Sequence, residues 1–429
     1  MHYNFYEINE NKPNHLIYKA RYKQTLYLVD PILELYKGKI YSCLIKLFTN
    51  NCTSTFGYRI FSIKKSYLRT ITNLLSSWIF SLYIDYDFSS DYFFPTNYNK
   101  TKPLEDILRD LCKYDSTITN IEQKITDVIN KLKVDYKHLL ELLQSYKKSK
   151  MYLNNKSNYK IKKTIININK KLNCNMTFHK FEIITPFIIK DKRLQNILNN
   201  ILISNKNYDK MLNAYNGPKK IINDFLWAIV YRYQLLGSNN HQLAVLPNIM
   251  NKMVLDYNLN FECYASAINN TFPNFCSIYW DLEKYFGSIG SFFNIIPIKG
   301  TYGFNPPYQK DVIENGIRKL FNLLDTSNEN LTFIITIPIW DFYGKNMMKK
   351  QFNNELKKQN IDYGDFLIMD EIKKSKYLKK IRMIPKEEFT YIDHNFELYK
   401  NKTIQNTYVI ILSNSSYNFD NLDNYLFIA

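Results

Sequence analysis

Glycine and cysteine are both scarce in this chain of 429 residues. Only 11 glycines occur, which argues against a propeller or another fold rich in tight loops. The six cysteines show neither C-x-x-C spacing nor pairing with the six histidines, so we expect reduced thiols and no metal site. A Walker loop and a G-x-S-x-G motif are also missing, so the chemistry that depends on either motif is not indicated.

Long apolar runs are missing too. The start of the chain, residues 1–14, is polar and contains no signal peptide. The most apolar stretch, residues 71–84, is interrupted by threonine, asparagine and serine and is too short to span a bilayer. We therefore expect a core helix there, no membrane partner, and an intracellular, reducing compartment.

Basic residues outnumber acidic residues, and the whole excess lies in the first part of the sequence. Residues 1–250 contain 37 Lys and Arg against 19 Asp and Glu, whereas residues 251–429 contain 20 of each. Heavy use of Asn, Lys, Ile and Tyr points to an A·T-rich coding genome, but such a bias would spread the lysines evenly. The first part is therefore predicted to contact a polyanion.

Within this part, residues 142–181 carry ten lysines and no acidic residue. Together with an arginine in the helix expected at 221–236, they supply the candidate RNA-binding residues Lys147, Lys148, Lys150, Lys162, Lys163 and Arg232. A solvated, lysine-rich linker is the alternative interpretation of the same run.

Hydrophobic periodicity divides the chain in two. Residues 1–239 carry apolar stripes at helical spacing, for example over 118–143, and are expected to form a mainly helical, basic region that binds RNA or the cap. Residues 240–429 alternate short apolar runs with amphipathic segments, as in an α/β sheet domain. Its strands are expected at 261–265, 275–279, 301–304, 332–337, 366–369 and 407–412.

The most informative stretch is Asn305-Pro306-Pro307-Tyr308, which follows one expected strand and precedes an amphipathic helix at 311–324. The exocyclic amine of adenine is a poor nucleophile because its lone pair is conjugated into the ring. The Asn305 side-chain carbonyl and the Pro306 main-chain carbonyl can accept from its two N–H groups, since the prolines restrict the backbone. Tyr308 offers a ring face on which an extruded base can stack. The loop thus predicts an adenine N6-methyltransferase, and a strand followed by a proline turn is the alternative.

A second candidate site element is the segment 285–291, whose two glycines would let the backbone approach a cofactor. We select Phe286, Gly287 and Ser288 from it, although its spacing is not that of a dinucleotide fingerprint. Just before it, Asp281 or Glu283 can accept from a cofactor ribose hydroxyl. An exposed loop carboxylate is the alternative for either residue.

Five blocks of the second part, taken in order, resemble the phosphorylated-CTD-interacting factor family of cap-specific adenosine N6-methyltransferases. They are 261–266 (FECYAS), 285–288 (YFGS), 305–308 (NPPY), 333–340 (FIITIPIW) and 406–409 (NTYV). The resemblance implies a Rossmann-like, S-adenosylmethionine-dependent methyltransferase domain. It further implies methylation of N6 on the 2′-O-methyladenosine beside the cap of capped mRNA, with a helical domain that helps to hold the cap.

By position, the resemblance implies a catalytic motif at 305–308, with Tyr where the family usually has Phe, and places Ala265 and Ser266 beside the cofactor. Animal members begin with a WW module that binds phosphorylated polymerase tails. The four tryptophans here have no close pair. The prediction is therefore a form without a WW domain, with binding to the RNA polymerase II tail in doubt and a cytoplasmic rather than nuclear address.

Two other functions fit the same residues. A DNA or internal-RNA adenine N6-methyltransferase would share the loop, and it differs in needing no capped 5′ end. A catalytically silent RNA-binding subunit would keep the basic region but would fail to bind S-adenosylmethionine.

Overall fold

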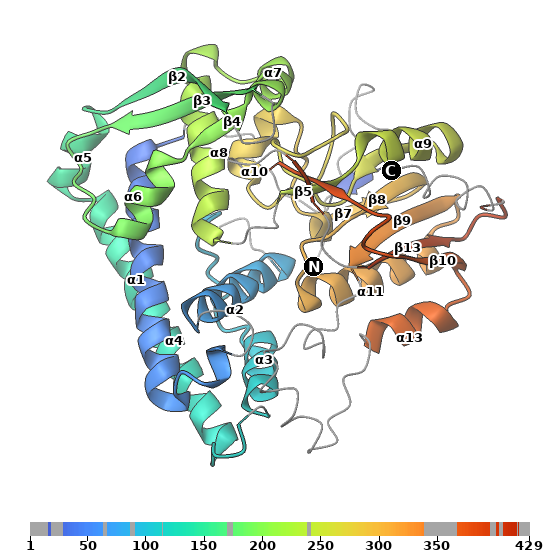
Figure 1. Cartoon of the computed structure of the whole chain (residues 1–429), viewed down its shortest axis with the longest axis horizontal. Helices are drawn as coiled ribbons and strands as arrows, with labels where there is room; N and C mark the ends of the chain where they lie inside the picture. Colours follow the sequence, from blue (N-terminus) through green and yellow to red (C-terminus); the bar gives the residue numbers. More distant parts are fainter. Residues whose placement is uncertain are drawn as a thin grey trace.

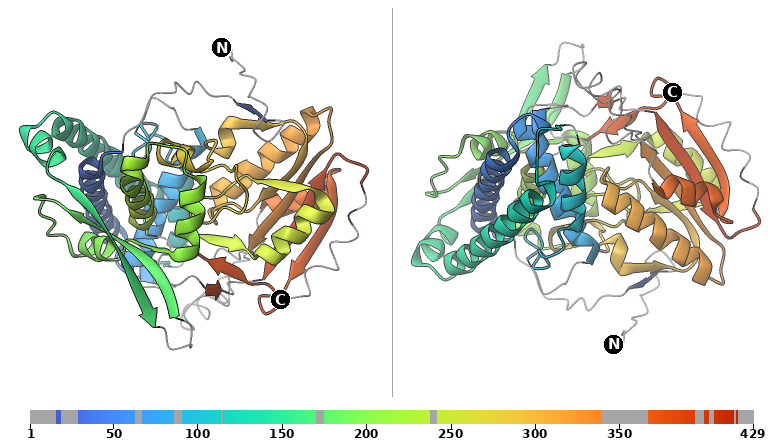
Figure 2. Two further views of the ribbon diagram at one scale, coloured as in Figure 1. Left: turned by 90° about the horizontal axis from the view of Figure 1, so that it is seen from above. Right: turned by 90° about the horizontal axis from the view of Figure 1, so that it is seen from below.

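In the computed structural model, the long helices of the first part lie at one end of the molecule and the main sheet of the second part lies at the other (Figure 1, Figure 2). It describes residues 16–18, 29–62, 67–85, 91–113, 115–169, 175–237, 242–338, 367–394, 400–402, 406–417 and 419. Among the helices in these ranges, none combines the length and the apolar character needed to cross a membrane.

The first part is mainly helical in its described residues. Its α-helices are α1 (Pro31–Phe56), α2 (Tyr67–Leu82), α3 (Lys102–Cys112), α4 (Ile121–Lys147), α5 (Lys150–Lys156), α6 (Lys192–Asn199), α7 (Asn205–Ala214) and α8 (Ile222–Leu236). Asp30 caps α1 by accepting from the Leu33 N–H, and Pro31 suits the first helical position. The core helix expected at 71–84 corresponds to α2, which buries Trp78.

The lysine run at 142–181 is regular structure wherever it is described. It covers the end of α4, then α5, then β2 (Lys160–Asn169) and most of β3 (Asn175–Ile184), which pair antiparallel along their whole length. The short strand β4 (Leu202–Ser204) continues this sheet beside β3. The linker interpretation is therefore wrong for the described residues, because helices α4 and α5 and the pairing of β2 with β3 hold most of the described lysines in regular structure.

The second part is built around a five-stranded mixed sheet. Its strands are β6 (Leu259–Glu262), β8 (Gly300–Phe304), β9 (Leu331–Pro338), β10 (Leu378–Ile384) and β13 (Thr407–Ser413). Their order is β10-β13-β9-β8-β6, with β6, β8 and β9 parallel and β13 antiparallel between β9 and β10. Isolated parallel bridges from Glu262 to Phe275 and from Phe275 to Ser288 continue the pattern beyond β6.

Helices cover both faces of this sheet. The side chains of β9 alternate, so that Phe333 and Ile335 pack with α11 (Lys310–Thr326) and α13 (Leu367–Lys374). Ile334 points to the opposite face and packs with α9 (Pro247–Tyr257). A strand covered on both faces is largely apolar, which explains the stretch at 332–337, where only Thr332 and Thr336 are polar. The α/β class expected for this part is confirmed.

Two small antiparallel sheets, one of two strands and one of three, accompany the main sheet. β1 (Leu16–Tyr18) pairs with β7 (Ile295–Pro297), and β11 (Tyr391–Asp393) pairs with both β5 (Leu243–Val245) and β12 (Lys400–Lys402). Because β1 belongs to the first part of the sequence and β7 to the second, the chain crosses between the two parts more than once.

Two expected strands differ from the structure. Residues 367–369 of the run expected at 366–369 begin α13, and residue 366 lies outside the described residues. A run of four apolar residues does not distinguish a strand from a buried helix turn, and here the helix prevails. The strand expected at 275–279 is reduced to the bridge at Phe275, after which the chain enters the short helix α10 (Trp280–Glu283).

A buried charge network joins the two parts. Arg232 of α8 donates from Nε and Nη2 to Glu34 of α1, both at 2.8 Å. It also donates from Nη1 and Nη2 to Asp281 of α10, at 2.8 and 2.7 Å. Lys37 lies 2.9 Å from both Glu34 and Asp91. The prediction that Arg232 binds RNA is therefore wrong, since its fully buried guanidinium is occupied by two carboxylates.

Arg232→Met should lower the free energy of unfolding by about 3–5 kcal/mol, because it leaves two carboxylates buried without their counter-charge. Urea unfolding followed by circular dichroism measures this loss. Arg109→Met is the control, since Arg109 pairs with exposed Glu122 at the surface and its loss should leave the unfolding midpoint nearly unchanged. Similar losses in the two variants would contradict a special role for the buried network.

Candidate functional site

The loop at residues 305–308 leaves the end of β8 and leads into α11. The Oδ1 atom of Asn305 is buried and has no hydrogen-bond partner in the described part of the chain. A buried acceptor without a donor costs free energy, so this oxygen is available to accept a hydrogen bond from a ligand in the cavity. Pro306 and Pro307 fix the backbone on either side of the next peptide, which holds the Asn305 carboxamide in place.

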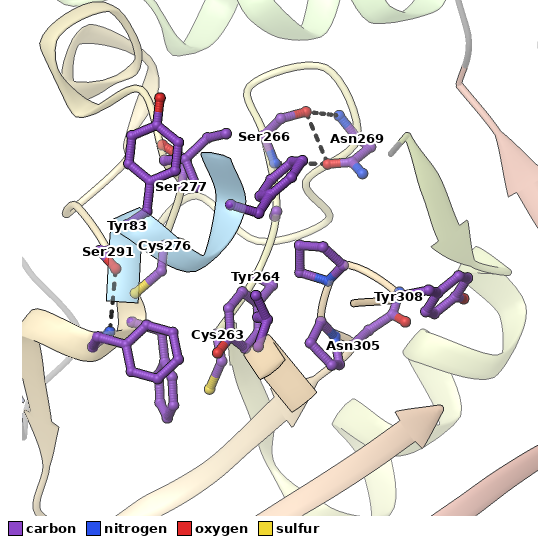
Figure 3. A pocket seen from close by; sticks show the side chains of 18 of the residues that line it. Tyr83, Cys263, Tyr264, Ser266, Asn269, Cys276, Ser277, Ser291, Asn305 and Tyr308 are labelled. Atoms are coloured by element: carbon purple, nitrogen blue, oxygen red, sulfur yellow. Dashed lines mark hydrogen bonds between the residues drawn. The ribbon is translucent and has the colours of Figure 1, made fainter. Parts of the chain in front are cut away.

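Asn305 lines a cavity at the carboxyl ends of the parallel strands (Figure 3). Its walls come from residues 263–266 and 269 after β6, 276–278 after the bridge at Phe275, and 305–308 after β8. Phe80, Tyr83 and Tyr233 of the helical part close it from the other side. The empty volume between the walls, including space open to solvent, is about 780 Å³. Small-molecule sites in α/β sheets lie at this edge.

None of the cavity's lining side chains in the described residues carries a charge. Burial raises the pKa of Cys263 and of Cys276, so both thiols stay protonated. Burial, together with neighbouring Tyr391, also raises the pKa of Tyr308 well above its ordinary value. The cavity therefore offers aromatic surface, hydroxyls and amides but no acid or base that titrates near neutrality.

The six predicted cofactor residues separate into two groups. Ala265 and Ser266 line the cavity, whereas Asp281, Phe286, Gly287 and Ser288 do not. Asp281 is engaged through both oxygens by Arg232, so it has none left for a ribose. The expectation that it contacts the cofactor is thus corrected.

The segment around Gly287 lies behind the cavity wall. Phe286 is buried beside Tyr215, with ring centroids 5.0 Å apart. The Ser288 hydroxyl bonds that of Ser277 at 2.7 Å, and Ser277 lines the cavity. At Gly287, with φ +101°, an added Cβ would lie 1.9 Å from the Pro273 carbonyl oxygen. The glycine is needed for close approach to protein backbone, not to a cofactor.

Sequence reasoning missed several cavity residues. Asn269 accepts from the Ser266 N–H at 2.7 Å, and the Ser266 hydroxyl donates to Gln242, also at 2.7 Å. Glu283 is fully buried behind the wall, where it accepts from Tyr233 of α8 at 3.0 Å. Burial raises the pKa of Glu283 to about 7. Polar residues just after a strand end were the available signal for Asn269 and Ser277, but Tyr233 comes from a helix distant in sequence.

The candidate RNA-binding lysines lie on the outside of the first part. Lys148, Lys150, Lys162 and Lys163 are exposed, and Lys147 is half-buried with its ammonium 4.0 Å from Asp91. They occupy the junction of α4 and α5 and the strand β2. The structure thus keeps five of the six candidates at the surface and removes only Arg232.

A mixed sheet with helices on both faces and an uncharged cavity at its strand ends is compatible with a methyltransferase fold. Residues 205–363, which include this cavity loop, match the family described as "Phosphorylated CTD interacting factor 1 WW domain". This match supports the resemblance to the phosphorylated-CTD-interacting factor family that the five sequence blocks indicated, and the first four of these blocks lie within the matched segment.

Two curated relatives support the same assignment. The proteins from Homo sapiens and Mus musculus are each 31% identical to this chain over 121 residues. Both are named "mRNA (2'-O-methyladenosine-N(6)-)-methyltransferase". The aligned segment is 27% of this chain and only 17% of each relative, so the chain spans a small fraction of their length.

The description of the matched family corrects one expectation. It names a WW domain, so the prediction of a form without this module is wrong, and the doubt about polymerase-tail binding loses its basis. That prediction used tryptophan spacing alone, and the matched segment contains Trp227, Trp280 and Trp340 at wide intervals.

Gly287→Ala should destabilise the protein more than Gly57→Ala. Both glycines have left-handed φ angles, +101° and +77°, so each substitution brings backbone strain of roughly 1–3 kcal/mol. Only at Gly287 does the new Cβ also clash with backbone, since nothing lies within 4 Å at Gly57. Thermal unfolding compares the two variants. Equal shifts in Tm, with only ligand affinity lost at Gly287, would instead place this glycine against the cofactor.

Proposed function

We propose that this protein transfers a methyl group from S-adenosylmethionine to N6 of the 2′-O-methyladenosine next to the cap of mRNA. The observation that carries this proposal is the unpaired Asn305 oxygen in an uncharged cavity at the end of β8. The names of the two relatives support the reaction and the substrate class. Mechanistically, the site needs to polarise an amine and does not need to remove a proton beforehand.

The residues present fit the cofactor. The aromatic and hydroxyl groups that line the cavity suit an adenosine. Ala265, Ser266, Asn269 and Ser277 would hold the cofactor, because they follow the strand ends where ligands bind in such sheets. When bound, S-adenosylmethionine supplies the electrophilic methyl group.

The loop then acts on the acceptor amine. The Asn305 Oδ1 atom accepts from one N–H, and the Pro306 main-chain carbonyl accepts from the other, which draws the nitrogen toward tetrahedral geometry. These bonds strengthen as the nitrogen attacks, so they stabilise the transition state more than the bound substrate. Tyr308, which lines the cavity, contributes its ring face for stacking.

The strand order supports a Rossmann-like methyltransferase domain at 240–429. Reading from β10 through β6 and on to the bridges at Phe275 and Ser288 gives a doubly wound order, with chain reversal beside β6 and β8. The mainly helical residues 1–239 are proposed as the RNA- and cap-binding region. Its surface carries the exposed lysines, and three of its aromatic residues close the cavity.

The proposed partner is the 5′ end of capped mRNA. A phosphorylated polymerase tail is a second proposed partner, because the matched family is named for this interaction. An internal-RNA or DNA adenine methyltransferase would use the same loop, and a silent RNA-binding subunit would use only the lysines. An intracellular, reducing location stays a prediction; the five cysteines that the structure describes are free.

Methyl transfer to matched RNAs tests the proposal directly. The RNAs should differ only in the cap and in the first nucleotide, and label should enter only the capped RNA that begins with 2′-O-methyladenosine. Asn305→Ala should lower kcat by roughly 10²-fold or more, as for loss of one transition-state hydrogen-bond partner, while S-adenosylmethionine still binds. Asn315→Ala on α11 is the control, since Asn315 bonds Asp311 and does not line the cavity. Equal turnover of uncapped RNA would favour the internal-RNA alternative.

Replacing Lys147, Lys148, Lys150, Lys162 and Lys163 by Gln should weaken RNA binding and flatten its salt dependence. Each phosphate contact to a single strand contributes a log–log slope of about −0.7. The control replaces five exposed lysines of the second part, Lys373, Lys374, Lys376, Lys379 and Lys386, and removes the same charge. Fluorescence anisotropy with labelled RNA at several salt concentrations measures both variants. Identical slopes would rule out the β2 and α4–α5 lysines as the RNA contact.

A further inference from the structure

The loop that follows β6 contains no glycine. Its sequence, residues 263–272, is CYASAINNTF, and it supplies a quarter of the cavity wall through residues 263–266 and 269. Glycine-rich loops reach a cofactor because their backbone is unrestricted. This loop must instead be held in shape by bonds from its surroundings, and three charged side chains make such bonds. Glu283 accepts from the Ala267 main-chain N–H at 2.8 Å, and Lys210 and Glu262 bond the residues that follow.

Lys210 of α7 holds the middle of the loop. Its ammonium donates to the main-chain carbonyl oxygens of Ile268 at 2.8 Å and Asn270 at 3.0 Å. Glu262, at the end of β6, holds the far side of the loop. Its Oε2 atom accepts from the main-chain N–H groups of Thr271 at 2.6 Å and Phe272 at 3.3 Å. Four bonds from Lys210 and Glu262, which carry opposite charges, therefore hold four residues of the stretch 268–272.

The charged groups around Lys210 are few. Burial lowers the pKa of Lys210 to about 8, with Lys206 adding to this effect and Glu262 opposing it. Burial raises the pKa of Glu262 to about 7, against the lowering effect of its two main-chain donors and of Lys210. His394 is bonded to Asn207 of α7, and burial together with Lys210 and Lys206 lowers its pKa to about 3. His394 therefore stays neutral over the range in which the other two titrate.

We propose that Lys210 is a positioning residue for the cofactor site: from α7 it shapes the loop at 263–272 so that Ser266 and Asn269 meet the ligand. It contacts neither the cavity nor any reacting atom, since it is absent from the cavity lining. The identity of the ligand rests on the proposed function. The consequence is that a helix of the N-terminal part controls the shape of a pocket in the sheet domain.

Lys210→Met removes the ammonium while keeping a side chain of similar length. S-Adenosylmethionine affinity, measured by calorimetry at pH 7, should fall about tenfold, which corresponds to about 1.4 kcal/mol. Lys206→Met is the matched control, because Lys206 is an exposed lysine one turn earlier on α7 and should change affinity less than twofold. Equal affinity of wild type and Lys210→Met would overturn the proposal.

The pH profile separates positioning from a general loss of folding. The ammonium loses its charge as the pH rises through about 8, so wild-type affinity should decline between pH 7 and 9.5. Lys210→Arg keeps its charge throughout this range, so its affinity should not show this decline. Titration of the ligand itself affects both profiles equally, so its effect cancels in the difference between them. Parallel profiles would show that the charge at position 210 does not act on the site. This comparison uses only wild type and Lys210→Arg, so it tests the proposal even if Lys210→Met fails to fold.

Hydrogen exchange of the loop tests the same role without any ligand. The amides of Thr271 and Phe272, which Glu262 holds, should exchange faster in Lys210→Met than in wild type, and the Lys206→Met control should match wild type. If wild type fails to bind S-adenosylmethionine, the proposed function is wrong, but this measurement still decides whether Lys210 shapes the loop. Unchanged exchange in Lys210→Met would show that it does not.

Discussion

The structure depends first on a buried guanidinium. Burial on its own raises the pKa of Glu34, but the positive charges of Arg232 and Lys37 outweigh it and hold that pKa below its ordinary value. Both carboxylate partners of Arg232 therefore act as fixed anchors, one on α1 and one on α10. Because a buried charge without its partner is costly, α8 has one favourable position between the two parts. Tyr233, the next residue, thereby comes to line the cavity.

Charge is arranged around the cavity but not inside it. Arg232, Glu283, Lys210 and Glu262 are all absent from the cavity lining. Glu283 accepts from Tyr233, which lines the cavity, and Lys210 and Glu262 bond the backbone of the loop at 263–272, which supplies part of the wall. An uncharged interior suits an amine acceptor and an electrophilic methyl donor, because no carboxylate competes for the methyl group. In the proposed reaction, polarisation by fixed dipoles, of which the Asn305 carbonyl is the clearest, would be the means of catalysis.

The helical part contributes to two proposed surfaces through one short helix. Tyr208 of α7 accepts a hydrogen bond from Lys163 of β2 at 2.7 Å, and two residues later Lys210 bonds the cavity loop. Lys163 belongs to the proposed RNA contact, so the same helix touches the supports of both binding sites. Helix α7 would thus connect the proposed RNA contact and the proposed cofactor site, which are formed by different residues.

The sequence alone determined the elements whose signal is local: the apolar run of β9, the amphipathic α11, the loop at Asn305, and the excess of charge before residue 250. It could not determine the partners of isolated charges. Arg232 and Asp281 look like surface residues in a basic, polar sequence, yet they pair with each other in the interior across 49 positions. For the same reason, Lys210 and Glu262 could not be identified as site residues from the sequence. A side chain's role depends on which distant segment packs against it, and only the tertiary structure decides that.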